Sequence, residues 1–307
     1  MSIEVPPSRF VDIDGAVHYV EWDGPRVGGS EKERTFVLVH GLGGSLLSWL
    51  AVAPGIARHG RVLALDLPGF GRSERVGRRS RVSDLRATVS RFVDEVAGAP
   101  VVLVGNSMGG GISMLEAALE PAAVEALVLS NSVFPWTRGS LPAPVVMLGF
   151  SLYRLPGVGE WVARQRITRV EAERAVEIGF RIIAADPSTI PEDLVRLHVE
   201  QLVRHQQNPD AGPAFLEAAR SLMALGRRRE VVRWIVNSVK CPVLVIHGRS
   251  DRLVPVGFAE AAGRMRPDWD LRLLPKVGHV PQMEAPERWL AAVEDWLGNL
   301  GATGPVT

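Results

Sequence analysis

Short, unbroken apolar runs alternate with segments of helical period along the first part of this chain. Apolar runs of this kind, bounded by glycine, proline or aspartate, are typical of strands buried on both faces of a parallel sheet. Residues 82–96 repeat apolar side chains at Leu85, Val89 and Phe92, which predicts one buried helix face. The alternation predicts an α/β fold, with a mostly parallel sheet and helices on both faces. The expected strands are residues 35–39, 61–65, 100–104 and 126–129, preceded by a hairpin at residues 9–22.

The strand pattern then stops between residue 134 and about residue 236. Prolines and glycines divide this stretch into helical segments, at residues 145–152, 159–166, 169–184, 191–206 and 213–225. The pattern resumes with strands at residues 242–248 and 270–274 and with helices near residues 257–265 and 286–297. A helical block of this length is too long for a loop. We therefore expect a core domain of residues 1–133 and 237–307, with a helical cap of residues 134–236 over the C-terminal ends of the strands.

Composition narrows the setting in which such a protein works. The 307 residues are 46% hydrophobic, and the formal net charge of +1 gives no general attraction to nucleic acid. The single cysteine, Cys241, excludes a disulfide within the chain and fits a reducing compartment. Residues 1–7 lack the features of a signal peptide, and no apolar stretch is long enough to span a bilayer. We expect a cytoplasmic monomer or homodimer that binds a small-molecule substrate, without nucleic acid and without a membrane span.

The most informative segment is Gly105-Asn106-Ser107-Met108-Gly109, which joins an apolar strand to a predicted helix. A serine with a glycine two residues to each side, at a sharp strand-to-helix turn, forms the nucleophile elbow G-x-S-x-G. The turn exposes the serine hydroxyl, and the glycines let strand and helix pass close together. The alternative is an ordinary glycine-rich turn. Ser107 is the candidate nucleophile.

A serine hydroxyl is a poor nucleophile by itself, so it needs a base, and the base needs an orienting carboxylate. His279 follows the last predicted strand, from which it can reach the elbow, and is the candidate base; its alternative role is to cap the next helix. Asp251 follows the strand at residues 242–248 and is the candidate acid. The order serine, aspartate, histidine is that of the nucleophile-elbow enzymes. Asp66 also ends a strand, but it precedes a Pro-Gly turn and is expected to hydrogen-bond that turn.

The negative charge that develops on a substrate carbonyl oxygen requires hydrogen-bond donors, normally two backbone N–H groups. Met108, directly after the serine, is the first candidate donor. The second is Leu42, in the glycine-rich loop at residues 40–44, with Gly43 as its alternative. Glycines in that loop allow the backbone to approach a substrate closely.

Together these segments resemble the α/β-hydrolase superfamily, over nearly the whole chain. The resemblance rests on HGLGG at 40–44, DLPGFGRS at 66–73, GNSMGG at 105–110, HGRSD at 247–251 and GH at 278–279. It implies the α/β-hydrolase fold, a Ser–His–Asp triad, an inserted helical cap, and neither metal nor cofactor. Haloalkane dehalogenases and epoxide hydrolases of this fold use an aspartate at the elbow, so Ser107 excludes both activities.

The elbow is similar to that of the meta-cleavage-product hydrolases, which cut carbon–carbon bonds in ring-cleavage dienones. Those enzymes usually carry a tryptophan directly after the catalytic histidine, where this chain has Val280. They also hold the substrate carboxylate with an arginine of the cap. The candidates for that arginine are Arg164, Arg166, Arg174 and Arg181, among which the sequence does not choose.

We predict a serine hydrolase that cleaves a small, largely apolar carboxylic ester or lactone through an acyl-enzyme. Carbon–carbon hydrolysis of dienones is one alternative, and a ligand-binding receptor with slow residual hydrolysis is another, because a fold does not fix a function. Apolar side chains of the cap and of the core rim either line the substrate pocket or pack the two parts together. The candidate pocket residues are Trp49, Met147, Phe150, Trp161 and Val280.

Overall fold

The core of the molecule is a sheet of eight strands within the part of the chain that the computed structural model describes, residues 3–24, 34–133, 141–168 and 170–302. The strand order is β1-β2-β4-β3-β5-β6-β7-β8. The pairings β1–β2 and β2–β4 are antiparallel and all others are parallel, which confirms the mostly parallel sheet. The strands are β1 (Arg9–Asp12), β2 (Ala16–Trp22), β3 (Arg34–Val39), β4 (Gly60–Leu65), β5 (Val101–Asn106), β6 (Val124–Ser130), β7 (Val243–Gly248) and β8 (Asp270–Leu274).

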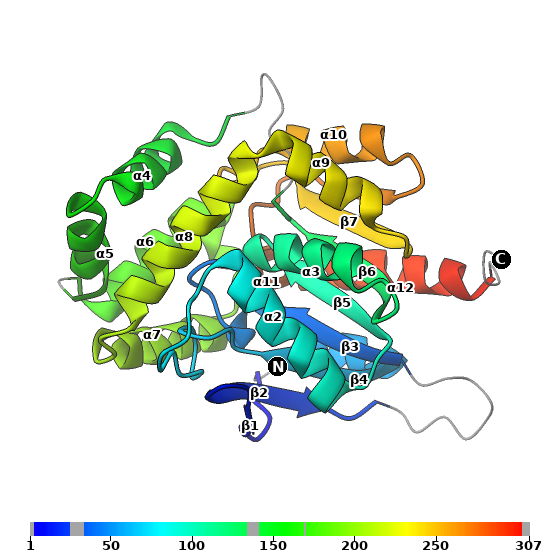
Figure 1. Ribbon diagram of the computed structural model, residues 1–307, viewed down its shortest axis with the longest axis horizontal. Helices are drawn as coiled ribbons and strands as arrows, with labels where there is room; N and C mark the ends of the chain where they lie inside the picture. Colours follow the sequence, from blue (N-terminus) through cyan, green and yellow to red (C-terminus); the bar gives the residue numbers. More distant parts are fainter. Residues whose placement is uncertain (1–2, 25–33, 134–140, 169, 303–307) are drawn as a thin grey trace.

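Helices cover both faces of this sheet (Figure 1). No helix in the described part of the chain is long and apolar enough to cross a membrane. The helices and helical turns are η1 (Leu46–Trp49), α1 (Ala53–Ile56), η2 (Ala57–His59), α2 (Val82–Phe92), η3 (Val93–Ala97), α3 (Met108–Leu119), α4 (Pro144–Arg154), α5 (Val158–Thr168), α6 (Ala172–Ile183), η4 (Pro187–Thr189), α7 (Glu192–Gln206), α8 (Ala211–Arg227), α9 (Arg229–Ser238), α10 (Val256–Met265), α11 (Pro281–Glu284) and α12 (Pro286–Ala302).

Alternate residues of the central strands point to opposite faces, which divides the core into two layers. In β3, Val37 and Val39 belong to the layer that packs against α2, α3, α9 and α10. Phe36 and Leu38 belong to the other layer, which is covered by η1, α1 and α12. Because both faces are covered, β3 has an unbroken apolar run instead of an alternating one.

Helices α4 to α8 lie together at one end of the sheet (Figure 1). They contact the loops that follow the strands: a Cβ atom on Gly43 would lie 3.1 Å from the Phe215 ring of α8, and one on Gly278 would lie 2.4 Å from the Ile183 carbonyl oxygen. Helix α9 differs, because its Ile235 and Val236 pack in the same core layer as α3. The division into core and cap at residue 236 stays a prediction.

Strand β5 and helix α3 meet at the elbow with no room for side chains. A Cβ atom on Gly105 would lie 2.5 Å from the Cα atom of Gly110, and one on Gly109 would lie 2.1 Å from the Val39 carbonyl oxygen. Both distances are far shorter than any normal contact. The two glycines of the elbow motif are therefore required by the close passage of α3 over β5 and β3.

This packing predicts that Gly109→Ala lowers the free energy of unfolding by about 1–3 kcal/mol, since the added methyl group overpacks a rigid backbone contact. Urea denaturation measures the change. The matched control is Gly149→Ala on α4, where a Cβ atom meets nothing within 4 Å. That helix position should gain roughly 0.5–1 kcal/mol. Wild-type stability of Gly109→Ala would contradict the close passage.

Candidate active site

Ser107 occupies the turn between β5 and α3 in a backbone conformation that non-glycine residues rarely adopt. Its φ is 54° and its ψ is −116°. The Ser107 N–H donates to the Ser130 carbonyl at 3.1 Å, and the Ser107 carbonyl accepts from the Gly111 N–H at 3.2 Å. Hydrogen bonds on both sides hold a conformation that costs of order 1–3 kcal/mol elsewhere. Such a strained residue at the end of a central strand is typical of a functional position.

His279 and Asp251 form a buried hydrogen-bonded pair, in which His279 Nδ1–H donates to Asp251 Oδ2 at 2.7 Å. The other oxygen, Oδ1, accepts from the backbone N–H groups of Leu253 at 2.8 Å and Val254 at 3.0 Å. Burial alone raises the pKa of the Asp251 carboxyl, but His279, with smaller contributions from His247 and the Asn131 hydrogen bond, more than offsets it, so the pKa lies below its usual value. The carboxylate is therefore ionised and fixed, as an orienting acid must be.

A second histidine, His247, also lies near Asp251, with 3.6 Å between Nε2 and Oδ2. Its Nε2–H donates to the Val254 carbonyl at 2.9 Å, and burial lowers its pKa. His247 is thus a neutral structural side chain. Only His279 presents Nδ1 to the carboxylate, which leaves Nε2 as the nitrogen for proton transfer.

Two asparagine side chains connect the histidine loop to the elbow. Asn106 Nδ2 donates to the His279 carbonyl at 3.2 Å, so the residue before Ser107 holds the loop that carries the histidine. Asn131, directly after β6, donates from Nδ2 to Asp251 Oδ2 at 2.6 Å and to the Gly278 carbonyl at 3.0 Å. Its φ of 44° and its place after a central strand mark it as a positioning residue.

The glycine-rich loop after β3 lies against the elbow. A Cβ atom on Gly41 would lie 3.1 Å from Ser107 Cβ. His40 fixes the shape of this loop: its Nδ1–H donates to the Gly41 carbonyl at 2.8 Å, and its Nε2 accepts from the Leu67 N–H at 3.0 Å. Burial lowers the pKa of His40. The neutral ring is needed here, because protonated Nε2 cannot accept a hydrogen bond.

Asp66 is not bonded to His279 and has a structural role. Its Oδ2 accepts from His18 Nδ1–H at 2.7 Å and from the Arg72 N–H at 2.8 Å, and its Oδ1 accepts from the Leu46 N–H at 2.8 Å. It thereby joins the turn after β4 to the start of η1. No group of three or more His, Cys, Asp or Glu side chains that could hold a metal ion occurs within the described residues.

Glu284, which the sequence reasoning missed, connects the histidine loop to the helical segment above it. Its Oε2 accepts from the Gly278 N–H at 2.7 Å. Its Oε1 accepts from the N–H groups of Ala185 at 3.0 Å and Asp186 at 3.1 Å. The His279 N–H also donates to the Ile183 carbonyl at 2.6 Å, so this bond joins the same two segments. The only sequence signal for this role is the position of Glu284 shortly after the Gly278-His279 pair.

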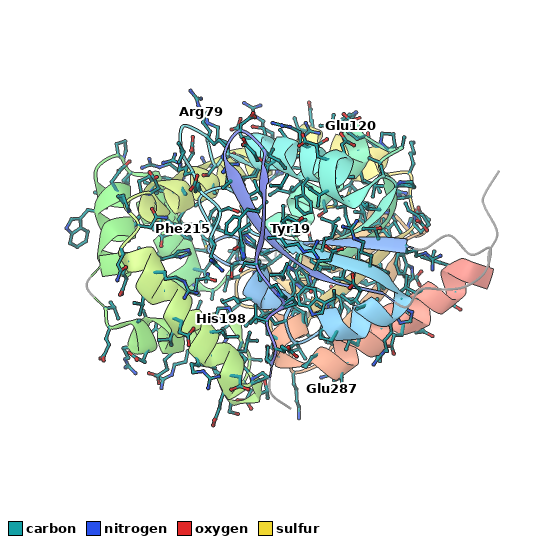
Figure 2. All side chains as sticks on the ribbon, turned by 90° about the horizontal axis from the view of Figure 1, so that it is seen from below. Tyr19, Arg79, Glu120, His198, Phe215 and Glu287 are labelled. Carbon is teal, nitrogen blue, oxygen red and sulfur yellow. The ribbon has the colours of Figure 1, made fainter. Side chains whose placement is uncertain are left out.

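The five candidate pocket residues do not gather at one place. Trp49 is fully buried, with its ring centroid 6.1 Å from that of Trp289, whereas Met147 and Trp161 are exposed. Phe150 packs against Tyr153, with ring centroids 6.2 Å apart, and Val280 is buried next to His279. Phe215 of α8, labelled in Figure 2, does reach the glycine-rich loop, since a Cβ atom on Gly43 would lie 3.1 Å from its ring. Substrate contacts of the five residues stay a prediction.

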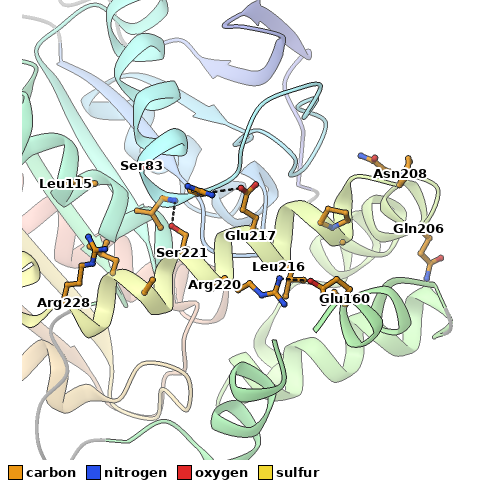
Figure 3. A pocket seen from close by; sticks show the side chains of 18 residues that line it. Ser83, Leu115, Glu160, Gln206, Asn208, Leu216, Glu217, Arg220, Ser221 and Arg228 are labelled. Atoms are coloured by element: carbon orange, nitrogen blue, oxygen red, sulfur yellow. Dashed lines mark hydrogen bonds and ion pairs between the residues drawn. The ribbon is translucent and has the colours of Figure 1, made fainter. Parts of the chain in front are cut away.

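A hollow of about 1110 Å³ lies on the outer side of α8 (Figure 3). Leu216 and Arg220 of α8 line it, together with Leu115 of α3 and Glu160 of α5. None of the candidate catalytic residues is among its lining side chains. The hollow is therefore distinct from the candidate active site.

The chain matches the family model described as the alpha/beta hydrolase fold over residues 34–286. This protein is an alpha/beta hydrolase. The match spans the elbow, both loops with candidate acid and base, and all helices between β6 and β7. Hydrolase activity follows from membership and from the hydrolases among its relatives.

Curated relatives of this alpha/beta hydrolase fall into different functional groups. A 2-hydroxy-6-oxononadienedioate/2-hydroxy-6-oxononatrienedioate hydrolase of Cupriavidus pinatubonensis is 28% identical over 306 residues, 96% of this chain and 97% of the relative. A dihydrolipoyllysine-residue acetyltransferase component of the acetoin cleaving system of Pseudomonas putida is 29% identical over 263 residues. That match covers 85% of this chain but only 62% of the relative.

Solved structures show the same fold. The haloalkane dehalogenase of Bradyrhizobium elkani superimposes with a TM-score of 0.78 at 21% identity, covering 96% of this chain and 99% of that one. At this identity the likeness concerns the fold alone. The serine at position 107 separates the two, since dehalogenases of this fold carry an aspartate there.

The neutral state of His40 predicts a pH dependence of stability. Because burial holds its pKa below 6.5, the unfolded chain binds a proton at this site before the folded protein does as the pH falls. Stability is therefore lost below pH 6.5, by up to about 1.4 kcal/mol per pH unit for this one group. Urea unfolding at about pH 7 and about pH 5.5, two values that bracket the pKa of the unfolded chain, measures how steeply stability falls with pH. His40→Gln should be less stable at the higher pH but should show a shallower fall; equal slopes would contradict the assignment.

The bonds of Glu284 predict a loss of turnover in Glu284→Gln. A glutamine amide offers one acceptor oxygen in place of two, so at least one backbone N–H loses its partner and the His279 loop is less well held. We expect kcat for a p-nitrophenyl ester to fall about tenfold with KM nearly unchanged, because the positioning of the base is affected and not substrate binding. Glu287→Gln, exposed on α12 (Figure 2), is the matched control. Equal kcat values for the two variants would exclude this part for Glu284.

Proposed function

We propose that this alpha/beta hydrolase cleaves a small, largely apolar carboxylic ester or lactone with Ser107, His279 and Asp251 as its catalytic triad. The observation that supports it most is the buried Asp251–His279 hydrogen bond of 2.7 Å, on a loop that Asn106 ties to the elbow. The acid is ionised, the base is oriented, and the serine beside Asn106 lies in a strained, fixed conformation. These are the groups that nucleophilic acyl transfer requires.

In the proposed reaction, His279 Nε2 takes the hydroxyl proton of Ser107 while Oγ attacks the ester carbonyl. The backbone N–H groups of Leu42 and Met108 stabilise the negative charge on the carbonyl oxygen. His279 then gives its proton to the leaving alcohol, and an acyl-enzyme remains. A water molecule, deprotonated by the same histidine, attacks the acyl group and releases the acid.

The charge pattern of the cap favours an uncharged substrate. Arg174 and Arg181, two of the four arginines considered as carboxylate ligands, both pair with Glu177 on the exposed side of α6, at 2.6 and 2.5 Å. The side chains of Arg164 and Arg166 lie outside the described residues. Val280, next to the candidate base, is apolar and buried. An acyl group without a second carboxylate fits these surroundings best.

Carbon–carbon hydrolysis of a dienone is the second candidate. Its support is the similarity to the Cupriavidus pinatubonensis hydrolase, which extends over nearly the full length of both chains. The same triad could serve that reaction. An arginine that binds the second carboxylate of such a substrate would have to be Arg164 or Arg166.

The proposal predicts that Ser107→Ala lowers the rate of p-nitrophenyl butyrate hydrolysis by about 10⁴-fold or more. Ser113→Ala is the matched control, since this buried serine of α3 donates only to the Gly109 carbonyl, at 2.9 Å. We expect the control to retain wild-type turnover. Retained activity in Ser107→Ala would refute the assignment of the nucleophile.

A ring-cleavage dienone, assayed beside the ester, separates the two candidate reactions. We expect a higher kcat/KM for the ester. A strong preference for the dienone would make carbon–carbon hydrolysis the favoured function in place of ester hydrolysis. A single turnover followed by a stall, with either compound, would favour a ligand receptor over an enzyme.

A further inference from the structure

The outward side of α4 and α5 carries apolar side chains, where a helix in contact with water normally carries polar ones. Val145 and Leu148, one turn apart on α4, are 62% and 61% exposed, and Trp161 on α5 is 61% exposed. Helix α5 lies beside α4 (Figure 1), so the exposed apolar side chains of the two helices lie on neighbouring parts of the cap. This cap patch consists of Leu141, Val145, Met147, Leu148, Leu155, Val158 and Trp161.

The inner side of α4 is already occupied. Tyr153 is buried there, with its ring 5.3 Å from that of Phe215 on α8, and it forms a small cluster with Ala163 and Leu216. This packing orients the cap patch away from the rest of the molecule. Exposed apolar patches of this kind mark a surface that binds something.

Positive charge borders the cap patch at Arg154. The sequence from residue 141 to residue 159 contains no aspartate or glutamate and a single charged residue, Arg154. At the other end of α4, the Ala143 N–H donates to the Arg252 carbonyl at 2.9 Å, while the Arg252 guanidinium donates to the Arg181 carbonyl of α6 at 3.2 Å. Within the described residues, neither the Arg154 nor the Arg252 guanidinium is ion-paired with a carboxylate. Glu160, next to Trp161, is neutralised by Arg220 at 2.7 Å.

We propose that the cap patch docks the protein on an anionic phospholipid surface. Helices that lie in a membrane interface combine exposed aliphatic side chains and tryptophan with arginine or lysine at their polar border. Anionic headgroups attract exposed arginine side chains near the surface. The cap patch supplies each of these features.

A second copy of the chain fits the cap patch less well. A two-fold dimer brings the same patch of both subunits together. Arg154 of both copies would then lie at the interface, and Glu160, the one carboxylate in residues 141–161, is already paired with Arg220 at 2.7 Å. Like charges facing each other disfavour such an interface.

Docking in this orientation brings the lipid surface near the candidate active site. Ala143, at the start of α4, bonds to the loop that carries Asp251. An apolar molecule leaving the lipid phase would therefore arrive near the C-terminal ends of the strands. The docking itself does not depend on the proposed ester chemistry.

Sedimentation with lipid vesicles tests the proposal on the full chain in a Ser107→Ala background, so that no lipid is turned over. We expect binding to vesicles of phosphatidylcholine mixed with phosphatidylglycerol. Val145→Asp and Leu148→Asp should each weaken binding at least about tenfold, since a charge replaces an aliphatic side chain that docking would bury in the lipid surface. Arg154→Gln should weaken it about fivefold on these vesicles and leave binding to pure phosphatidylcholine unchanged.

Val76→Asp is the matched control, because Val76 is 66% exposed but lies on the core, between β4 and α2. It should bind like the parent chain. Circular dichroism and thermal unfolding establish that each variant is folded. Absence of vesicle binding by the parent chain, or undiminished binding by both cap variants, would overturn the proposal. The proposal would also be overturned if the parent chain does not bind vesicles and light scattering shows that it forms a dimer, which Leu148→Asp abolishes.

Discussion

Helix α3 crosses the ends of β3 and β5 so closely that no side chain fits between them, and the geometry of the whole site depends on this contact. Gly109 lies directly under the carbonyl oxygens of Val39 and His40, where a Cβ atom would be 2.1 and 2.5 Å away. The same residues begin the glycine-rich loop whose backbone faces Ser107. One packing contact therefore sets both the position of the candidate nucleophile and its distance from the candidate oxyanion donors. Strain in the Ser107 backbone is tolerable because the sheet and the helix on either side are rigid.

The acid–base half of the site combines one close backbone contact, in which a Cβ atom on Gly248 would lie 2.1 Å from the Gly278 carbonyl oxygen, with polar connections between loops. The loops after β7 and β8 hold Asp251 and His279, and loops are by nature more mobile than the elements they join. Asn131 and Asn106 bind these loops from the ends of β6 and β5, and Glu284 binds the His279 loop to the segment after α6. Each of these side chains makes two or more hydrogen bonds in a buried place, where an unpaired partner would be costly. Catalytic groups held in this way need little reorganisation during the reaction.

The sequence predicted the sheet and the candidate catalytic side chains because each of them has a local signal. A continuous apolar run indicates a buried strand, and Ser107 and Asp251 each follow such a run, whereas His279 follows the less apolar strand at residues 270–274. Positioning residues have no comparable signal: Asn131 and Glu284 act through backbone groups that are distant in the sequence and become neighbours only in the fold. The same holds for the apolar residues of α4. Their periodicity indicates a helix with an apolar face, but Val145 and Leu148 point outward, because Tyr153 takes the contact with α8. The apolar periodicity of one helix does not identify which neighbouring element covers its apolar face.

The cap also determines where binding energy for a substrate can come from. Its arginines on α6 are paired with Glu177, its contact with the glycine-rich loop is the Phe215 ring, and the residue after the candidate base is Val280. Binding would then rest on burial of apolar surface, which is roughly proportional to area and has little directional preference. A pocket of this kind discriminates one methylene group by only about 10–200-fold, whereas a site built around a buried ion pair rejects the uncharged analogue far more strongly. Under the proposed ester hydrolysis, these surroundings would suit an enzyme that accepts a range of acyl groups of similar size, with the reaction restricted by the positions of Ser107 and His279 more than by recognition of a particular polar group.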